Sequence, residues 1–197
     1  MLVHALSPLH SSTLVWCWSL RFLDGDGAWK ESVVHRFNGK DGFNSAGGLI
    51  SDATGNLYGT TQSGGNPANC DGYGCGVVFE LVPQGGGKWR EKVLHNFDFS
   101  GGSDPNASLI FDSAGNLYGT TSFGGGPCFD SRGCGTAFEL MPTQNREWVE
   151  KVLFKFRGGD GAYPSSNLIF DSSGNLYGET LSSGTGAGPG AVFELSQ

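Results

Sequence analysis

Four cysteines form two closely spaced pairs. Cys70 and Cys75 have four residues between them, and Cys128 and Cys134 have five, each pair within a glycine-rich segment. Such pairs can form a local disulfide, share a four-cysteine zinc site or remain free thiols. Both spacings are longer than the usual zinc knuckle, so we predict the disulfides Cys70–Cys75 and Cys128–Cys134, which need an oxidising compartment. The fifth cysteine, Cys17, is expected to be a buried free thiol.

Acidic side chains recur at matching positions along the chain. An aspartate precedes a Gly-Asn turn three times, at Asp52, Asp112 and Asp171. An aspartate in such a turn accepts hydrogen bonds from nearby backbone groups, so we interpret these residues as turn caps. Calcium binding is the alternative, although the Asp-x-Asp-x-Asp-Gly series of an EF-hand loop does not occur in the sequence.

Three glutamates and two of the four histidines also recur at matching positions and are suited to acid–base chemistry. The glutamates recur in a Phe-Glu-Leu motif, at Glu80, Glu139 and Glu194. Catalysis needs an acid and a base in different environments, whereas repetition gives all three glutamates the same one, so pairing with lysines of a neighbouring strand is favoured. His35 and His95 occupy equivalent positions where a third copy has Phe154, which indicates packing. We predict no catalytic residue, no metal site and no cofactor.

Several aromatic residues lie in loop-like segments among Gly, Asn and Asp. They are Tyr73, Phe99, Phe123 and Phe129. Aromatic rings beside polar groups suit stacking on sugar rings, which makes these four the candidate binding residues. The alternative is that each ring packs beneath its own loop.

A repeat of about 60 residues organises these positions. The segments LISDATGNLYGTT, LIFDSAGNLYGTT and LIFDSSGNLYGET begin at Leu49, Leu109 and Leu168, which are 60 and 59 residues apart. The segments WKESVVHRF, WREKVLHNF and WVEKVLFKF, here called the Trp-strands, begin at Trp29, Trp89 and Trp148 with the same spacing. Three near-identical copies show that one structural unit is used repeatedly.

Each repeat predicts four strands and no helix. LIFD and NLYGTT form a hairpin across the Asp-x-x-Gly-Asn turn, the FEL segment follows a glycine-rich loop, and the Trp-strand comes last. Four strands in about 60 residues favour a β-propeller blade over a β-sandwich or a β-solenoid. We therefore predict an all-β, propeller-like fold of three four-stranded blades and a partial N-terminal blade.

Composition excludes several classes of protein. The chain has 34 glycines in 197 residues, well above ordinary usage of about 7%. Its net charge of −7 argues against nucleic-acid binding, which needs a basic surface. The longest apolar run, LVWCWSL from Leu14, is far too short to span a membrane and is read as a strand.

The repeated pattern resembles a known family. LIxDxxGNLYGTT, GxxFEL, WxEKVLxxF and GGDGAYP, between Trp29 and Leu195, resemble the GloVer repeat (Gloeo/Verruco-type tandem repeat) of bacterial exported proteins. The DxxGNLY hairpin is also similar to the NHL-type propeller repeat. The resemblance implies a secreted or surface-anchored protein with a propeller-like fold, and it carries over no catalytic residue. No convincing export signal is recognisable, so a piece of a longer repeat protein is one expectation.

The repeats also predict how the chain is divided and closed. We expect a leader and partial blade in 1–28, then repeats in 29–88, 89–147 and 148–197. The third hairpin lacks a following Trp-strand, while the first Trp-strand precedes any hairpin. Because closed propellers have four to eight blades, we expect an open arc whose apolar end faces drive self-association.

The function expected from sequence is that of a non-enzymatic extracellular or cell-surface module. It binds a carbohydrate or protein partner through the loops at the blade ends, where functional surfaces usually lie. The alternatives are a propeller-type polysaccharide hydrolase or lyase and a structural repeat fragment without its own ligand.

Overall fold

The chain is built from β-strands. The computed structural model describes residues 3–5, 17–23, 29–129, 131–183 and 188–196, with side chains from Trp29 onward. The helical structure in this part is one short 3₁₀ turn, η1 (Cys70–Gly72). No described helix is long and apolar enough to cross a membrane. The predicted all-β class is confirmed.

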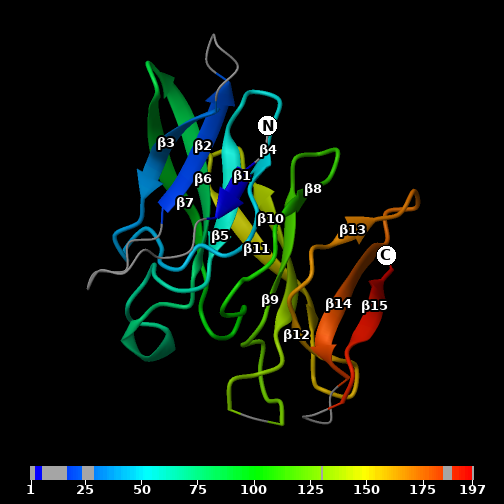
Figure 1. Cartoon of the computed structure of the whole chain (residues 1–197). Coiled ribbons are helices and arrows are strands. Elements are labelled where there is room, and N and C mark those ends of the chain that lie inside the picture. The colour runs from blue at the N-terminus through cyan, green and yellow to red at the C-terminus, as the bar shows by residue number, and fades with distance from the viewer. Residues whose placement is uncertain (1–2, 6–16, 24–28, 130, 184–187, 197) are drawn as a thin grey trace.

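The strands form four antiparallel sheets in chain order (Figure 1). The first contains β1 (Val3–Ala5), β2 (Cys17–Leu23) and β3 (Trp29–Arg36) in the order β1-β2-β3. The second contains β4 (Ile50–Ser51), β5 (Leu57–Thr61), β6 (Val77–Gly85) and β7 (Lys88–Asn96), in chain order. The third repeats this order with β8 (Ile110–Phe111), β9 (Leu117–Thr121), β10 (Thr136–Pro142) and β11 (Trp148–Lys155).

The fourth sheet differs at both edges. It contains β12 (Ala162–Pro164), β13 (Ile169–Phe170), β14 (Leu176–Ser182) and β15 (Ala191–Leu195). β14 pairs with β12, β13 and β15. The Trp-strands β7 and β11 are the fourth strands of the second and third sheets, and the fourth sheet has no described counterpart.

Tight turns and close packing explain why the hairpin sequence recurs. Gly115 in the β8–β9 turn has φ of 87°, a conformation that glycine adopts without strain. Gly119 in β9 is needed for a different reason, because a Cβ there would lie 2.7 Å from the Phe138 ring. β10 places Phe138 directly opposite Gly119, and the same pairing joins Gly59 to Phe79 and Gly178 to Phe193. The aromatic ring of each FEL strand therefore packs over the glycine of its hairpin.

The hydrophobic core lies between successive sheets. One cluster joins Tyr58, Leu94 and Phe97 of the second sheet region to Leu117 and Phe138 of the third. All five residues of β9 are buried, as expected of a strand covered on both faces. Face-to-face packing of this kind is how propeller blades stack.

The sheets form an open, propeller-like arc. β3 contacts β7, β7 contacts β11 and β9 contacts β12, so each sheet touches the next one along the chain. None of the sheets closes on itself, and the fourth sheet lies at one end of the arrangement (Figure 1). The predicted partial N-terminal blade is present as the first sheet. Its β2 contains residues 17–20 of the strand expected from Leu14. Residues 14–16 of that strand and the Cys17 side chain lie outside the described part of the chain.

Candidate functional site

Two disulfide-bearing loops lie at the same end of the arc. The Cα atoms of Cys70 and Cys75 are 5.3 Å apart and those of Cys128 and Cys134 are 5.4 Å apart, and the structure joins each pair by a disulfide. Each loop is also held to the following repeat. The amide of Asp104 donates to the Cys75 carbonyl at 3.0 Å, and the amide of Tyr163 donates to the Cys134 carbonyl at 2.9 Å. The disulfides thus stiffen loops that bridge neighbouring sheets.

A groove of about 530 Å³ lies between these loops. We call it the loop groove, and it is lined by Cys70, Asp71, Phe99, Ser103, Phe123, Ser131 and Arg132. Its residues come from the β5–β6, β7–β8 and β9–β10 connections, which approach one another at the lower end of the molecule in Figure 1. Segments about 60 residues apart in sequence therefore share one surface.

The wall of the loop groove is a cluster of aromatic rings and one guanidinium. The Arg132 guanidinium carbon lies 4.5 Å from the centre of the Phe123 ring, at cation–π distance. Phe123 also meets Tyr163 edge to face, with ring centres 5.3 Å apart. A backbone bridge between Ser103 and Phe123 fixes the two sides of the groove. The rings are therefore held in place before any ligand binds.

The four predicted aromatic residues divide between the groove and its surroundings. Phe99, which is 40% exposed, and the half-buried Phe123 line the loop groove. Phe129 packs edge to face on Tyr163, with ring centres 5.6 Å apart, and is not among the groove-lining residues. Tyr73 is 80% exposed and is not among the groove-lining residues.

Sequence reasoning missed two charged groups at this site. Arg132 lies between Cys128 and Cys134 in a glycine-rich loop, and it is not part of a repeated or recognisable sequence motif. Asp104 follows the groove-lining Ser103 and has φ of 61°, and one of its carboxylate oxygens is buried without a hydrogen-bond partner among the described residues. Burial raises the pKa of Asp104, and Arg132 opposes that rise. The backbone φ is also positive at the equivalent Asn44 and Tyr163, but the three residue types differ, so the sequence carried no signal for this position.

The model of the Gloeobacter/Verrucomicrobia repeat matches residues 23–193, which is most of the 197-residue chain. The chain belongs to this repeat family. No match was found among curated proteins.

In this repeat protein the recurring aspartates are turn caps. The Asp112 carboxylate accepts hydrogen bonds from the amides of Ala114 and Asn116 and from the Asn116 side chain, at 2.8 to 2.9 Å. Burial opposes ionisation of Asp112, but these bonds and one from Tyr118 outweigh it and lower its pKa. Asp52 and Asp171 accept the corresponding bonds. Donor hydrogens surround these oxygens, an arrangement suited to a carboxylate cap and unfavourable to a calcium ion.

The recurring glutamates join the same hydrogen-bond network. The Tyr118 hydroxyl lies 2.8 Å from Glu139 and 3.1 Å from Asp112, between two carboxylates. Burial and Glu139 raise the pKa of Tyr118 well above its ordinary value. Lys151 lies 3.5 Å from Glu139, the cross-strand pair expected from sequence. In the preceding sheet Lys92 stands opposite Glu80, but its ammonium group donates to the Arg146 carbonyl.

The two histidines lie between neighbouring Trp-strands. Each imidazole packs edge to face on the next phenylalanine, His35 on Phe37 and His95 on Phe97, with ring centres 4.8 Å apart in both cases. His95 also lies 3.5 Å from Glu150 of the following Trp-strand. Both histidines therefore pack against aromatic rings, as expected from sequence, and each also lies beside a carboxylate, His35 beside Asp41 and His95 beside Glu150.

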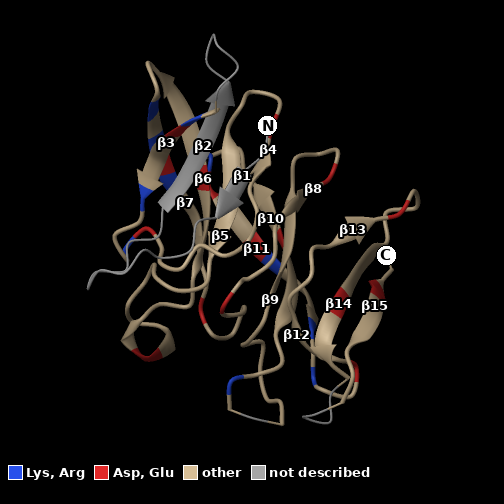
Figure 2. Cartoon of the chain, viewed as in Figure 1, with Lys and Arg blue, Asp and Glu red and all other residues tan. Residues whose placement is uncertain are grey.

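One described cluster has the donor set of a metal site. The ligand atoms of His35, Asp41 and Glu91 lie within 4.8 Å of one another. His35 of β3 and Asp41 of the β3–β4 connection already form a 3.2 Å contact, and Glu91 belongs to β7 of the second sheet. Figure 2 shows the other charged residues dispersed along the sheets and loops.

Proposed function

We propose that this chain is a non-enzymatic binding module that binds a glycan in the loop groove. The observation that carries the proposal is the convergence of Phe99, Phe123 and Arg132 with hydroxyl and carboxylate groups in one groove of about 530 Å³. Sites for small ligands are usually concave and combine apolar walls with a few placed polar groups. The loop groove has this composition.

Sugar rings match such a surface chemically. A pyranose has an apolar C–H face that packs on an aromatic ring and hydroxyl groups that both donate and accept hydrogen bonds. Phe99 supplies an exposed ring, Ser103 and Ser131 supply hydroxyl groups, and Arg132 supplies donors. The Asp71 carboxylate is an acceptor at the edge of the same groove. Disulfides hold the two loops that carry Asp71, Ser131 and Arg132, and the Ser103–Phe123 bridge holds the third connection, so little ordering is needed on binding.

The proposed location is outside the cytoplasm, at the bacterial cell surface or in the medium. Two disulfides in loops of this size are typical of oxidising compartments. Membership of the family does not itself assign an activity, and the turn carboxylates are engaged in capping and pairing. Binding without chemistry is therefore the function that the geometry favours.

A glycan array tests the proposal with matched variants. The wild-type chain should bind a defined group of oligosaccharides, and Phe99→Ala and Phe123→Ala should lose about tenfold or more in affinity. Tyr73→Ala is the control, since its exposed ring lies outside the groove.

Three results would count against a glycan site. The first is no retained oligosaccharide, the second is equal loss in the Tyr73→Ala control, and the third is hydrolysis of the arrayed glycans. Specific capture of a protein partner by the same groove would replace the glycan in this proposal.

A further inference from the structure

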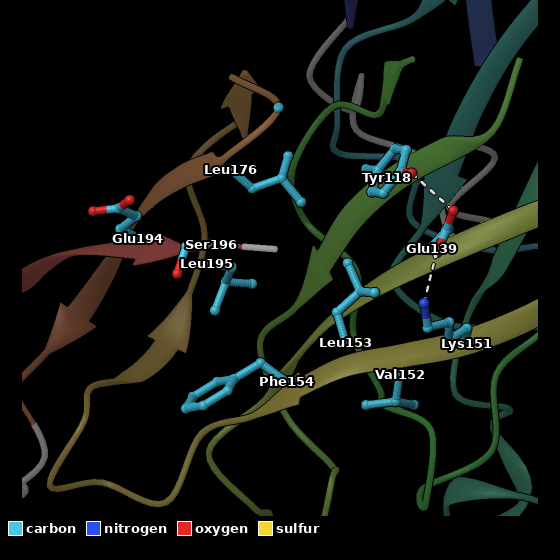
Figure 3. A pocket seen from close by; sticks show the side chains of 11 residues that line it. Tyr118, Glu139, Lys151, Val152, Leu153, Phe154, Leu176, Glu194, Leu195 and Ser196 are labelled. Carbon is cyan, nitrogen blue, oxygen red and sulfur yellow. Dashed lines mark hydrogen bonds and ion pairs between the residues drawn. The ribbon is translucent and has the colours of Figure 1, made fainter. Parts of the chain in front are cut away.

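A second groove, of about 720 Å³, lies between the third and fourth sheets beside β15. We call it the β15 groove. Figure 3 shows Tyr118, Lys151, Leu153 and Phe154 along the third sheet and Leu176 and Leu195 along the fourth. It shares no lining residue with the loop groove.

The β15 groove lies where the other sheets have a Trp-strand. In the second sheet β7 pairs with β6, and in the third sheet β11 pairs with β10. β15 is the equivalent of β6 and β10, and among the described strands it pairs with β14 alone. Its other edge presents backbone donors and acceptors of the kind that accept an added strand.

Burial of equivalent residues shows what an added strand would cover. The leucines of the first two FEL strands, Leu81 and Leu140, are both 0% exposed. Leu195, at the same position of β15, is only partly buried and lines the groove. Phe193 is likewise partly buried, whereas Phe138 is 0% exposed. A fourth strand on β15 would complete the burial of these side chains.

Contacts at the occupied position define the chemistry of the added strand. Trp148 of β11 packs against Tyr58 of the preceding sheet, with ring centres 6.5 Å apart. Tyr118 is the equivalent of Tyr58 and lines the β15 groove, so a tryptophan at the position equivalent to Trp148 would lie beside it. Lys151 of β11 pairs with Glu139, and the equivalent Glu194 of β15 is exposed.

We infer that the β15 groove binds an extended strand with the Trp-strand sequence of this repeat, presented by another copy of the repeat. The first Trp-strand of the chain is not the occupant, because β3 already pairs with β2 and contacts β7. Main-chain hydrogen bonds to β15 supply affinity, and the tryptophan and lysine positions set the register. This strand-addition site stands independently of the glycan proposal.

Phe154 adds a specificity element. At the occupied interface His95 faces Glu150 of the next Trp-strand, and His35 lies beside Glu91 in the same way. Phe154 replaces the histidine at the β15 groove. The groove therefore offers no histidine to the glutamate that every Trp-strand carries, so replacing that glutamate by glutamine in the bound strand should leave its affinity unchanged or raise it.

Fluorescence anisotropy with a labelled peptide tests the inference. The probe is KWREKVLHNF, the sequence of residues 88–97. It should bind the wild-type chain saturably, and the Trp89→Ala peptide should bind about tenfold more weakly or worse. The Glu91→Gln peptide should bind as well as the parent or more tightly. The Phe99→Ala protein, altered only in the loop groove, should bind the peptide like wild type.

A charge exchange tests the register. The Lys92→Glu peptide should bind wild-type protein about two- to fivefold more weakly, because an exposed cross-strand pair contributes modestly. The Glu194→Lys protein should restore its binding and weaken the parent peptide. Absence of saturable binding, insensitivity to the tryptophan, or failure of the charge exchange to restore affinity would each overturn the inference.

Discussion

Removal of one hydroxyl group at three equivalent positions tests how the carboxylate network stabilises the sheets. The changes are Tyr118→Phe, Tyr58→Phe and Tyr177→Phe. Tyr118 is 5% exposed and its hydroxyl lies 2.8 Å from Glu139, which is 7% exposed. Without that hydroxyl, a buried carboxylate oxygen loses its donor, a change that costs about 1 to 3 kcal/mol of unfolding free energy. The ring itself stays, so no cavity forms.

The third position is the internal control. The Tyr177 hydroxyl lies 3.3 Å from Asp171, and β15 leaves its partner Glu194 exposed to water. Water replaces the lost donor there, so Tyr177→Phe should cost less than the other two changes. Urea unfolding followed by tryptophan fluorescence measures each difference. Equal losses at all three positions, or no loss in Tyr118→Phe, would refute the reasoning.

The remaining predictions address packing, charge, end faces and covalent structure. Gly119→Ala should destabilise more than Gly115→Ala in the same unfolding assay. A Cβ at Gly119 clashes with the buried Phe138 ring, whereas alanine at Gly115 has open space and bears only the strain of its positive φ. Burial and Asp98 raise the pKa of Glu150 to about 7 from an ordinary 4.5, with Lys155 opposing. The folded state therefore favours the protonated Glu150 carboxyl. The stability that this protonated group contributes is fully present below pH 4.5 and is lost as the pH rises through 7. Glu150→Gln should match wild type at pH 4.5 and exceed it by about 1 to 3 kcal/mol at pH 8, and parallel pH profiles would contradict this. The fourth sheet exposes 74% of Val192, so light scattering should show self-association that Val192→Glu reduces, and a wild-type monomer at all concentrations would contradict it. Peptide mapping without reductant should recover both disulfides, and four alkylatable thiols in native protein would exclude them.

The repeat made the architecture predictable from sequence. The 60-residue spacing and the glycine-asparagine turn indicated the hairpin, and the alternating Trp-strand indicated the outer strand. The predicted order within a sheet, with the hairpin first, the FEL strand next and the Trp-strand last, is confirmed. In the structure each complete sheet takes its hairpin and FEL strand from one repeat and its last strand from the start of the next, as β6 and β7 do. The requirement for Gly119 depends on the ring of Phe138, which only the strand register brings to it.

The candidate site was less predictable, for a physical reason. Phe99 and Phe123 were identified because aromatic rings are unusual in glycine-rich loops. Arg132 and Asp104 were missed because their roles depend on three loops that meet only in the folded chain. Tyr73 satisfied the same sequence criterion as Phe99 yet lies outside the groove. Loop composition predicts that binding residues are present, whereas tertiary structure selects which of them share a surface.

Chemical-shift mapping by NMR is the most direct test of the loop groove as a glycan site. Labelled protein would be titrated with the oligosaccharide that the array retains most tightly. The account predicts saturable shifts at the backbone amides of Ser103, Phe123 and Arg132, with the strand residues of β15 unchanged. Shifts confined to residues outside the loop groove, or no shifts at saturating oligosaccharide, would contradict it.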